Sequence, residues 1–144
     1  MKTVAELLQS KGNASVYTIS PEQTVLEAVA LMADKGIGAL LVTEGSEVVG
    51  IITERDYARK VILLERSSQA TPVSDIMTAA VMYVHPNQTS SECMKLMTEK
   101  RLRHLPVLEN GKLLGLLSIG DLVKGVISDQ QETIDQLEQY IRGE

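Results

Sequence analysis

Tryptophan and phenylalanine are both absent from this chain of 144 residues, and only four tyrosines are present. Because 44% of the residues are hydrophobic, the chain can form a core, but that core must be aliphatic, with six methionines available to fill irregular spaces. The single cysteine, Cys93, excludes a disulfide framework and favours a reducing compartment. Apart from that cysteine, the chain has only two histidines. No group of residues therefore has the spacing of a metal site, and we predict no metal site.

Long apolar runs are missing too. No stretch of about 18 apolar residues occurs, so we expect no membrane-spanning segment. The first eight residues carry an acid, Glu6, inside their apolar run and no small-residue cleavage site, which argues against a signal peptide. A net charge of −5 argues against non-specific binding to nucleic acid. We therefore expect a soluble, cytoplasmic protein.

The feature that the sequence does contain is a repeat. Residues 50–56, Gly-Ile-Ile-Thr-Glu-Arg-Asp, return as residues 115–121, Gly-Leu-Leu-Ser-Ile-Gly-Asp, 65 positions later. Both segments read as a glycine, two aliphatic residues, a hydroxyl residue, two variable residues and an aspartate. Each lies where a strand-like run changes to a helical pattern, and the same offset aligns Pro21 with Pro86 and Leu40 with Leu105. The register predicts two copies of one structural unit.

Each copy predicts the order strand, helix, strand, strand, helix. The turn residues at 44–47 and 109–112 indicate hairpins, Ser20 or Thr24 can cap a helix, and Gly36 can end it. We divide the chain into repeats at 1–66 and 73–128 and a helical tail at 129–144. In the first repeat we predict strands at 16–19, 39–42 and 48–52, a helix ending at Gly36 and a helix at 53–64. In the second repeat we predict strands at 81–84, 105–108 and 113–117, a helix to about 99 and a helix from about 119.

The predicted fold class is α+β, with two βαββα units packed sheet to sheet in pseudo-twofold symmetry and a C-terminal helix. The tail places Ile134, Leu137, Tyr140 and Ile141 on one helical stripe. This stripe allows two interpretations: the tail packs on its own domain, or it contacts a partner subunit.

The duplicated unit and its corner, glycine, two aliphatic residues, threonine or serine, two further residues and aspartate, resemble the tandem CBS domain, also called a Bateman module. The resemblance covers roughly residues 3–128 and includes the Ile-Ser-Pro and Val-His-Pro segments and the Arg-His-Leu-Pro-Val strand at 103–107. It resembles the stand-alone members of that family, because no catalytic domain is attached. The resemblance implies a regulatory module without catalytic activity, which binds an adenosine compound in the cleft between its repeats and pairs into homodimers.

The resemblance also implies roles for particular residues. Asp56 and Asp121 would accept hydrogen bonds from the ribose diol, and Thr53 and Ser118 would lie beside a phosphate at a helix start. The adenine would lie between the corner strand of one repeat and the backbone of the other unit's first strand. The implied binding set is Val16, Tyr17, Ser20, Gly38, Ala39, Ile51, Thr53, Arg55, Asp56, Val81, Met82, Arg103, His104, Leu116, Ser118 and Asp121.

Two alternatives stay open at this point. Each hydroxyl residue with an acid three positions later is also a helix capping box, which needs no ligand. Arg103 and His104 match phosphate-binding positions, but cations near a helix C-terminus are favourable by themselves. The copies also differ, because Gly38-Ala39 stands in place of Arg103-His104 and Gly120 in place of Arg55, so one of the two sites could bind poorly.

The sequence therefore predicts a regulatory module that binds AMP, ADP or ATP, acts as a homodimer and signals to an unidentified effector protein. NAD or S-adenosylmethionine in the same cleft is an alternative ligand. A structural or interaction module with degenerate sites is an alternative function. A small nucleotide-processing enzyme is a third possibility, but no nucleophile with a triad context and no metal set supports it.

Overall fold

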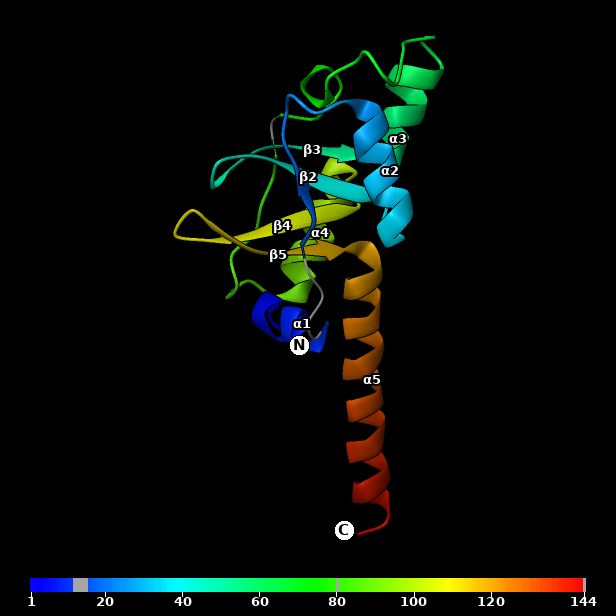
Figure 1. Cartoon of the computed structure of the whole chain (residues 1–144). Helices are drawn as coiled ribbons and strands as arrows, with labels where there is room; N and C mark the ends of the chain where they lie inside the picture. Colours follow the sequence, from blue (N-terminus) through cyan, green and yellow to red (C-terminus); the bar gives the residue numbers. More distant parts are fainter. Residues whose placement is uncertain (12–15, 80, 144) are drawn as a thin grey trace. The chain divides into compact units, whose positions relative to one another are not determined.

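The computed structural model describes residues 1–11, 16–79 and 81–143 and divides into two compact units (Figure 1). We call them the first-repeat unit and the second-repeat unit. The first-repeat unit comprises Ser15–Met82 with Gly111–Leu113, and the second-repeat unit comprises Met1–Ala14, Tyr83–Asn110 and Leu114–Glu144. Neither unit is one continuous stretch of chain. Within the described ranges, no helix has the length and apolar character needed to cross a membrane.

The first-repeat unit holds a three-stranded sheet in the order β1-β2-β3. Strand β2 pairs in parallel with β1 and antiparallel with β3, and the antiparallel register shifts between Val42 and Thr43. Its buried core is aliphatic, as the composition predicts, and centres on Met32, Leu40 and Ile52. The elements are β1 (Thr18–Ile19), α2 (Val25–Lys35), β2 (Ala39–Glu44), β3 (Glu47–Thr53), α3 (Glu54–Tyr57), the π-helix η1 (Ala58–Ile62) and the 3-10 helix η2 (Val73–Asp75).

The second-repeat unit holds a two-stranded sheet, β4-β5, and a core of its own. Leu105, Leu117 and Leu122 are fully buried in this core, together with Cys93, which is the small core residue that its helical position suggests. Burial raises the pKa of the Cys93 thiol, and the neighbouring Glu92 raises it further. The elements are α1 (Val4–Ser10), α4 (Ser90–Lys100), β4 (His104–Glu109), β5 (Lys112–Ser118, of which residues 114–118 belong to this unit) and α5 (Ile119–Ile141). The α+β prediction is confirmed.

The helix ends follow the predicted chemistry. Thr24 is the N-cap of α2, where its side chain accepts a hydrogen bond from the Glu27 backbone N–H at 3.2 Å. Gly36 ends the same helix in the left-handed conformation, with φ 66°. The equivalent position in the second repeat is Arg101, which adopts φ 56° although it has a side chain. The Asn110-Gly111 turn has positive φ at both residues, as expected of a tight hairpin.

Three predicted elements differ from the structure. The helix predicted at 53–64 continues beyond α3 as a π-helix, in which the Leu63 backbone N–H donates to the Ala58 carbonyl five residues earlier. In the predicted strand 81–84, Val84 alone forms a bridge, to Val107. The helix from Ile119 and the tail helix are one continuous helix, α5, because no proline or left-handed glycine interrupts it before Gly143.

The chain before each repeat docks in an equivalent manner. In the second-repeat unit, the Val4 backbone N–H donates to the Gln88 carbonyl at 2.8 Å. The next residue, Ala5, donates to the Pro86 carbonyl at 2.9 Å. The N-terminal segment therefore attaches to the second repeat, although it precedes the first repeat along the chain.

The linker repeats this docking in the first-repeat unit. The Val73 backbone N–H donates to the Gln23 carbonyl at 2.8 Å, and Ser74 donates to the Pro21 carbonyl at 3.0 Å. Gln23 and Pro21 precede Gln88 and Pro86 by 65 positions, whereas Val73 follows Val4 by 69. The two segments are thus equivalent pieces, each placed on the repeat that does not follow it directly in the sequence.

The corner glycines permit this docking. A Cβ atom on Gly50 would lie 2.6 Å from the Met77 sulfur and 3.0 Å from the Thr78 carbonyl oxygen. A Cβ atom on Gly115 would lie 2.7 Å from the Leu8 side chain. Both motif glycines therefore serve close packing of the docked segment, but only Gly50 faces backbone as well as a side chain.

This difference gives a prediction about stability. We expect Gly50→Ala to destabilise the protein by about 1–3 kcal/mol, because backbone at Thr78 must move. We expect Gly115→Ala to cost less, since the Leu8 side chain can rotate away and the loss of glycine restricts the unfolded chain. Urea unfolding measures the free energy of unfolding of both variants. An equal loss of stability in the two variants, or a larger loss in Gly115→Ala, would contradict the prediction.

Candidate functional site

Each repeat forms the predicted corner between its last strand and the following helix. Thr53 is the N-cap of α3, accepting a hydrogen bond from the Asp56 backbone N–H at 3.1 Å, while Asp56 Oδ2 accepts from the Thr53 backbone N–H at 3.0 Å. Ser118 and Asp121 repeat this capping box at the start of α5, at 3.2 and 2.7 Å. The capping interpretation is therefore confirmed at both corners. It does not test a ligand role, because the capping hydrogen bonds use the Oδ2 atom of each carboxylate and do not involve Oδ1.

Both corner aspartates are mostly buried and paired with a lysine. The side chains of Asp56 and Asp121 are each 14% exposed. Lys60 lies 3.2 Å from Asp56 Oδ1, one turn further along the same segment, and also donates to the Ile76 carbonyl at 3.0 Å. Each acid thus contacts a cation as well as its own helix start.

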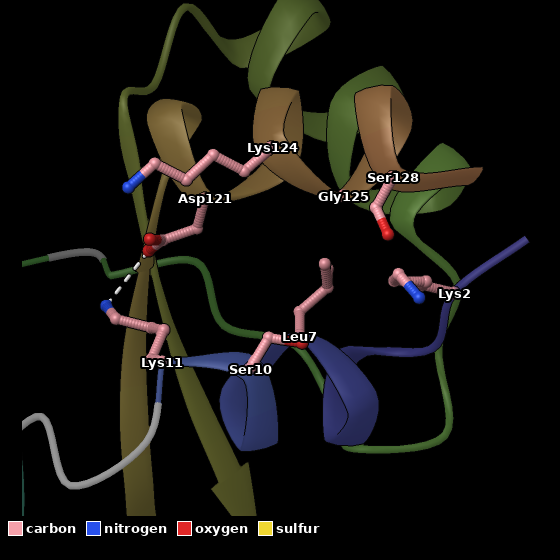
Figure 2. A pocket seen from close by; sticks show the side chains of 8 residues that line it. All are labelled: Lys2, Leu7, Ser10, Lys11, Asp121, Lys124, Gly125 and Ser128. Atoms are coloured by element: carbon pink, nitrogen blue, oxygen red, sulfur yellow. Dashed lines mark hydrogen bonds and ion pairs between the residues drawn. The ribbon is translucent and has the colours of Figure 1, made fainter. Parts of the chain in front are cut away.

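The lysine at the second corner comes from far away in the sequence. Lys11 donates to Asp121 Oδ2 at 2.9 Å (Figure 2). It also donates to the Leu116 carbonyl at 2.7 Å. Burial alone would raise the pKa of the Asp121 carboxyl, but hydrogen bonds from Ser118 and Lys11 and the Lys11 charge lower it below its ordinary value. Sequence analysis missed Lys11, because nothing local to residue 11 indicates on which repeat the N-terminal segment docks.

The segment before each middle strand contacts the corner. The Glu54 backbone N–H donates to the Gly38 carbonyl at 3.1 Å. At the equivalent place, the Ile119 backbone N–H donates to the Arg103 carbonyl at 2.9 Å. This repeated bond brings the predicted residues 38 and 103 to the helix start in both units, although the Arg103 side chain itself is exposed.

His104 lies beside the second corner. Burial lowers the pKa of His104 below its ordinary value, Asp121 opposes that shift, and Lys11 and Arg103 add to it. This shift favours the neutral imidazole, which offers a ring N–H and a ring nitrogen acceptor. Ala39, its counterpart in the first repeat, is buried in β2 opposite Thr53.

The remaining predicted residues fall into the two units unevenly. Ile51 lies in β3, where it exchanges backbone hydrogen bonds with Thr78 at 3.0 and 2.9 Å. Val81 and Met82 belong to the same compact unit as Ile51, whereas Leu116 belongs to the second-repeat unit. The first-repeat unit also contains Val16, Tyr17, Ser20 and the exposed Arg55. Whether residues of different units share one site stays a prediction.

A pocket of about 190 Å³ lies in the second-repeat unit, between α1 and α5 (Figure 2). Asp121 forms part of its wall, the ammonium group of Lys11 lies 2.9 Å from that carboxylate, and Lys124 lines the same pocket. The pocket thus combines one carboxylate with lysine side chains and serine hydroxyl groups. Its lining residues are Lys2, Leu7, Ser10, Lys11, Asp121, Lys124, Gly125 and Ser128.

Comparison with known proteins identifies similar chains. The family model of the CBS domain matches residues 4–63 and 73–128. The Arabidopsis thaliana "CBS domain-containing protein CBSX3, mitochondrial" is 39% identical over 149 residues, covering 98% of this chain and 72% of the relative. The Bacillus subtilis (strain 168) "CBS domain-containing protein YhcV" is 34% identical over 115 residues, covering 80% of this chain and 81% of the relative.

Solved structures agree with these matches. A CBS-domain protein from Burkholderia ambifaria MC40-6 superposes with a TM-score of 0.85 at 60% identity, covering 90% of this chain and 96% of that one. A hexameric CBS-CP12 protein from bloom-forming cyanobacteria has a TM-score of 0.75 at 28% identity, covering 85% of this chain and 70% of that one.

The Lys11–Asp121 pair gives a prediction about pH. Because the folded-state pKa of Asp121 is lowered, its stabilising contribution is present above the unfolded-state value near 4 and is lost as the pH falls through the folded-state value. We expect Lys11→Met to raise the pKa of Asp121 and to remove part of this acid-side dependence. NMR titration of the carboxyl group measures the shift, with Lys2→Met as the matched control, and an unchanged pKa in Lys11→Met would contradict the assignment.

Proposed function

Because the chain belongs to the CBS-domain family and carries two copies of that domain, we propose that it is a non-catalytic, cytoplasmic regulatory module that binds an adenine nucleotide and reports its occupancy to a partner protein. The observation that carries this proposal is the duplicated corner. In both units, a mostly buried carboxylate and a hydroxyl group lie together at the start of a helix. Burial of an acid at two equivalent helix starts goes beyond what an exposed cap requires.

A ribose diol suits these carboxylates. Two adjacent hydroxyl groups can donate to one carboxylate, and a hydrogen bond to a charged group contributes about 1.5–3 kcal/mol. The capping contacts use Oδ2 of Asp56 and of Asp121. The other oxygen of each carboxylate is therefore not needed by the helix start, and the cap already fixes its direction.

The phosphate of the nucleotide would lie at the helix start, beside the nearby cations. The first amides of α5 follow Ser118, and Lys11 lies 2.9 Å from Asp121 (Figure 2). In the first-repeat unit, Lys60 and Arg55 are the corresponding cations. A phosphate that attracts Lys11 weakens the ion pair between Lys11 and Asp121. Ligand binding in this way affects the N-terminal segment and α1.

We also propose that the protein acts as a homodimer. Self-association is supported by the relative that is named as a hexameric CBS-CP12 protein. The family membership by itself supports AMP, ADP and ATP as first candidates, with NAD and S-adenosylmethionine as the alternatives that share the adenosine group.

Thermal unfolding tests the binding proposal. We expect at least one of AMP, ADP, ATP, NAD and S-adenosylmethionine to raise the Tm, because a ligand at 100 times its Kd adds about 2.7 kcal/mol of stability. At roughly 2–4 °C per kcal/mol, the increase is easily measured. Ribose 5-phosphate and inorganic phosphate serve as controls without adenine. If none of the adenosine compounds changes the Tm, the proposal fails and an interaction module with degenerate sites is favoured.

Charge removal separates ligand binding from capping. Asp56→Asn and Asp121→Asn keep a carbonyl oxygen for the cap but remove the charged acceptor, so we expect at least one of them to weaken nucleotide binding by about tenfold to a hundredfold. Isothermal titration measures the affinity. Asp75→Asn, an exposed aspartate outside the corners, is the matched control. Unchanged affinity in both corner variants, with only stability reduced, would leave the acids as caps alone.

A further inference from the structure

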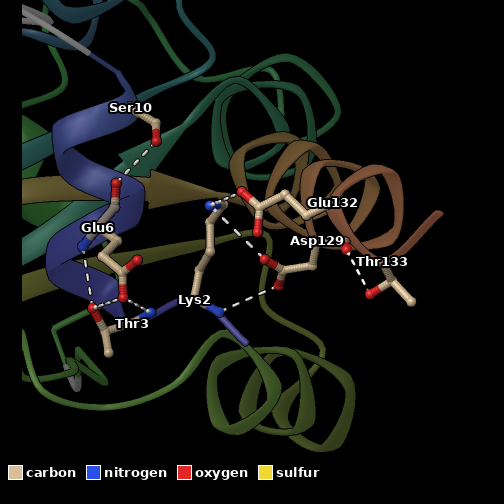
Figure 3. Close-up of polar contacts among 7 residues, drawn as sticks. All are labelled: Lys2, Thr3, Glu6, Ser10, Asp129, Glu132 and Thr133. Carbon is tan, nitrogen blue, oxygen red and sulfur yellow. Dashed lines mark hydrogen bonds and ion pairs between the residues drawn. The ribbon is translucent and has the colours of Figure 1, made fainter. Parts of the chain in front are cut away.

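The last turns of α5 have no partner within the described part of the chain. Lys2 lies 3.8 Å from Asp129 and 3.7 Å from Glu132, and its backbone N–H donates to Asp129 at 3.2 Å (Figure 3). Beyond these contacts α5 continues past α1 (Figure 1), and residues 130–143 are all exposed. The interpretation that the tail packs on its own domain is therefore wrong from Gln130 onward.

This exposed segment is not uniformly polar. Ile134 is 47% exposed, Leu137 57% and Ile141 81%, and they continue a row that begins nearer the unit with Val123 and Ile127. An isolated helix of about 12 residues is marginal in water. An apolar row along such a helix is typical of a helix that is stabilised by packing against another surface.

The spacing of the row is that of a coiled coil. Successive members are separated by four, three, four, three and four residues, the alternation of a heptad repeat that keeps a seam facing a second helix. At 3.6 residues per turn, the centre of the row lies about 125° around α5 from the positions that face its own unit, Leu122, Gly125 and Asp129. The members of the row are Val123, Ile127, Gln130, Ile134, Leu137 and Ile141.

We propose that this row pairs with the same row of a second copy in antiparallel orientation, which specifies the surface of the proposed homodimer. In the antiparallel register, Ile127 packs opposite Leu137 of the second copy, and Ile141 packs opposite Val123 of the second copy. Ile134 lies opposite Gln130, whose polar side chain fixes the register.

Charge complementarity selects this orientation. The antiparallel register places Lys124 of each copy beside Glu138 of the second copy, which gives two ion pairs across the interface. Both side chains are exposed on α5. On the other flank, Tyr140, which is 83% exposed, covers Val126 of the second copy. A parallel pair would place Glu138 against Thr133 and would form neither ion pair.

Cysteine crosslinking tests the pairing and its direction. In the antiparallel pair, Gln131 lies about 3 Å along the axis from Gln131 of the second copy, whereas the two Ile141 residues are about 27 Å apart. We expect Gln131→Cys to form a covalent dimer under mild oxidation and Ile141→Cys not to. The unmodified chain controls for Cys93, which is buried. The reverse pattern would establish parallel pairing, and a dimer that neither variant crosslinks would place the interface elsewhere; either result overturns the proposal.

A charge exchange tests the ion pairs independently. We expect Lys124→Glu and Glu138→Lys each to weaken dimerisation on the order of tenfold, because like charges then face each other twice, and the double variant to restore it. Asp135→Lys, on the outer side of α5, is the matched control for charge. Light scattering across a dilution series measures the dissociation. A wild-type monomer at all concentrations would remove the homodimer itself, whereas an unrestored double variant would remove only this register.

Discussion

The structure depends on how the chain ahead of each repeat attaches to the other repeat. Val4 and Val73 each donate a backbone hydrogen bond to a glutamine carbonyl that precedes a helix, and the following residue donates to a proline carbonyl. Backbone groups that approach the core must be paired, so these bonds fix the docked segments at equivalent positions. The second-repeat unit therefore requires the N-terminal segment from the far end of the chain, whereas the first-repeat unit takes its docked segment from the linker that follows it directly.

The corner motif shows how one residue can serve stability and a site together. Asp56 and Asp121 both close capping boxes, and both carry a neighbouring lysine. A cap of this kind stabilises its helix without any ligand. It also holds a carboxylate mostly out of water in one orientation, which is the preorganisation that a binding group needs. The stabilising role and the proposed binding role of these acids therefore use the same geometry.

The two corners are not electrostatically equal, although their backbones match. Lys60 reaches Asp56 from four residues away, whereas Lys11 reaches Asp121 from the N-terminal segment. His104 beside the second corner has a lowered pKa because it is buried, and Ala39 stands in its place in the first repeat. The second corner therefore contacts the N-terminal segment through Lys11, while the first contacts the segment around Ile76 through Lys60.

The duplication, the aliphatic core, the capping residues Thr24, Thr53 and Ser118 and the Asn110-Gly111 turn could all be predicted from the sequence, because each follows from contacts within a few residues or from periodicity. Tertiary structure alone decided that Lys11 pairs with Asp121, that Gly50 meets Thr78, and that α5 runs unbroken from Ile119 to Ile141. These features depend on segments far apart in the sequence or on the lack of a local stop signal. Short-range interactions therefore specify the helix ends, the turns and the repeat, and long-range packing specifies which segments contact one another.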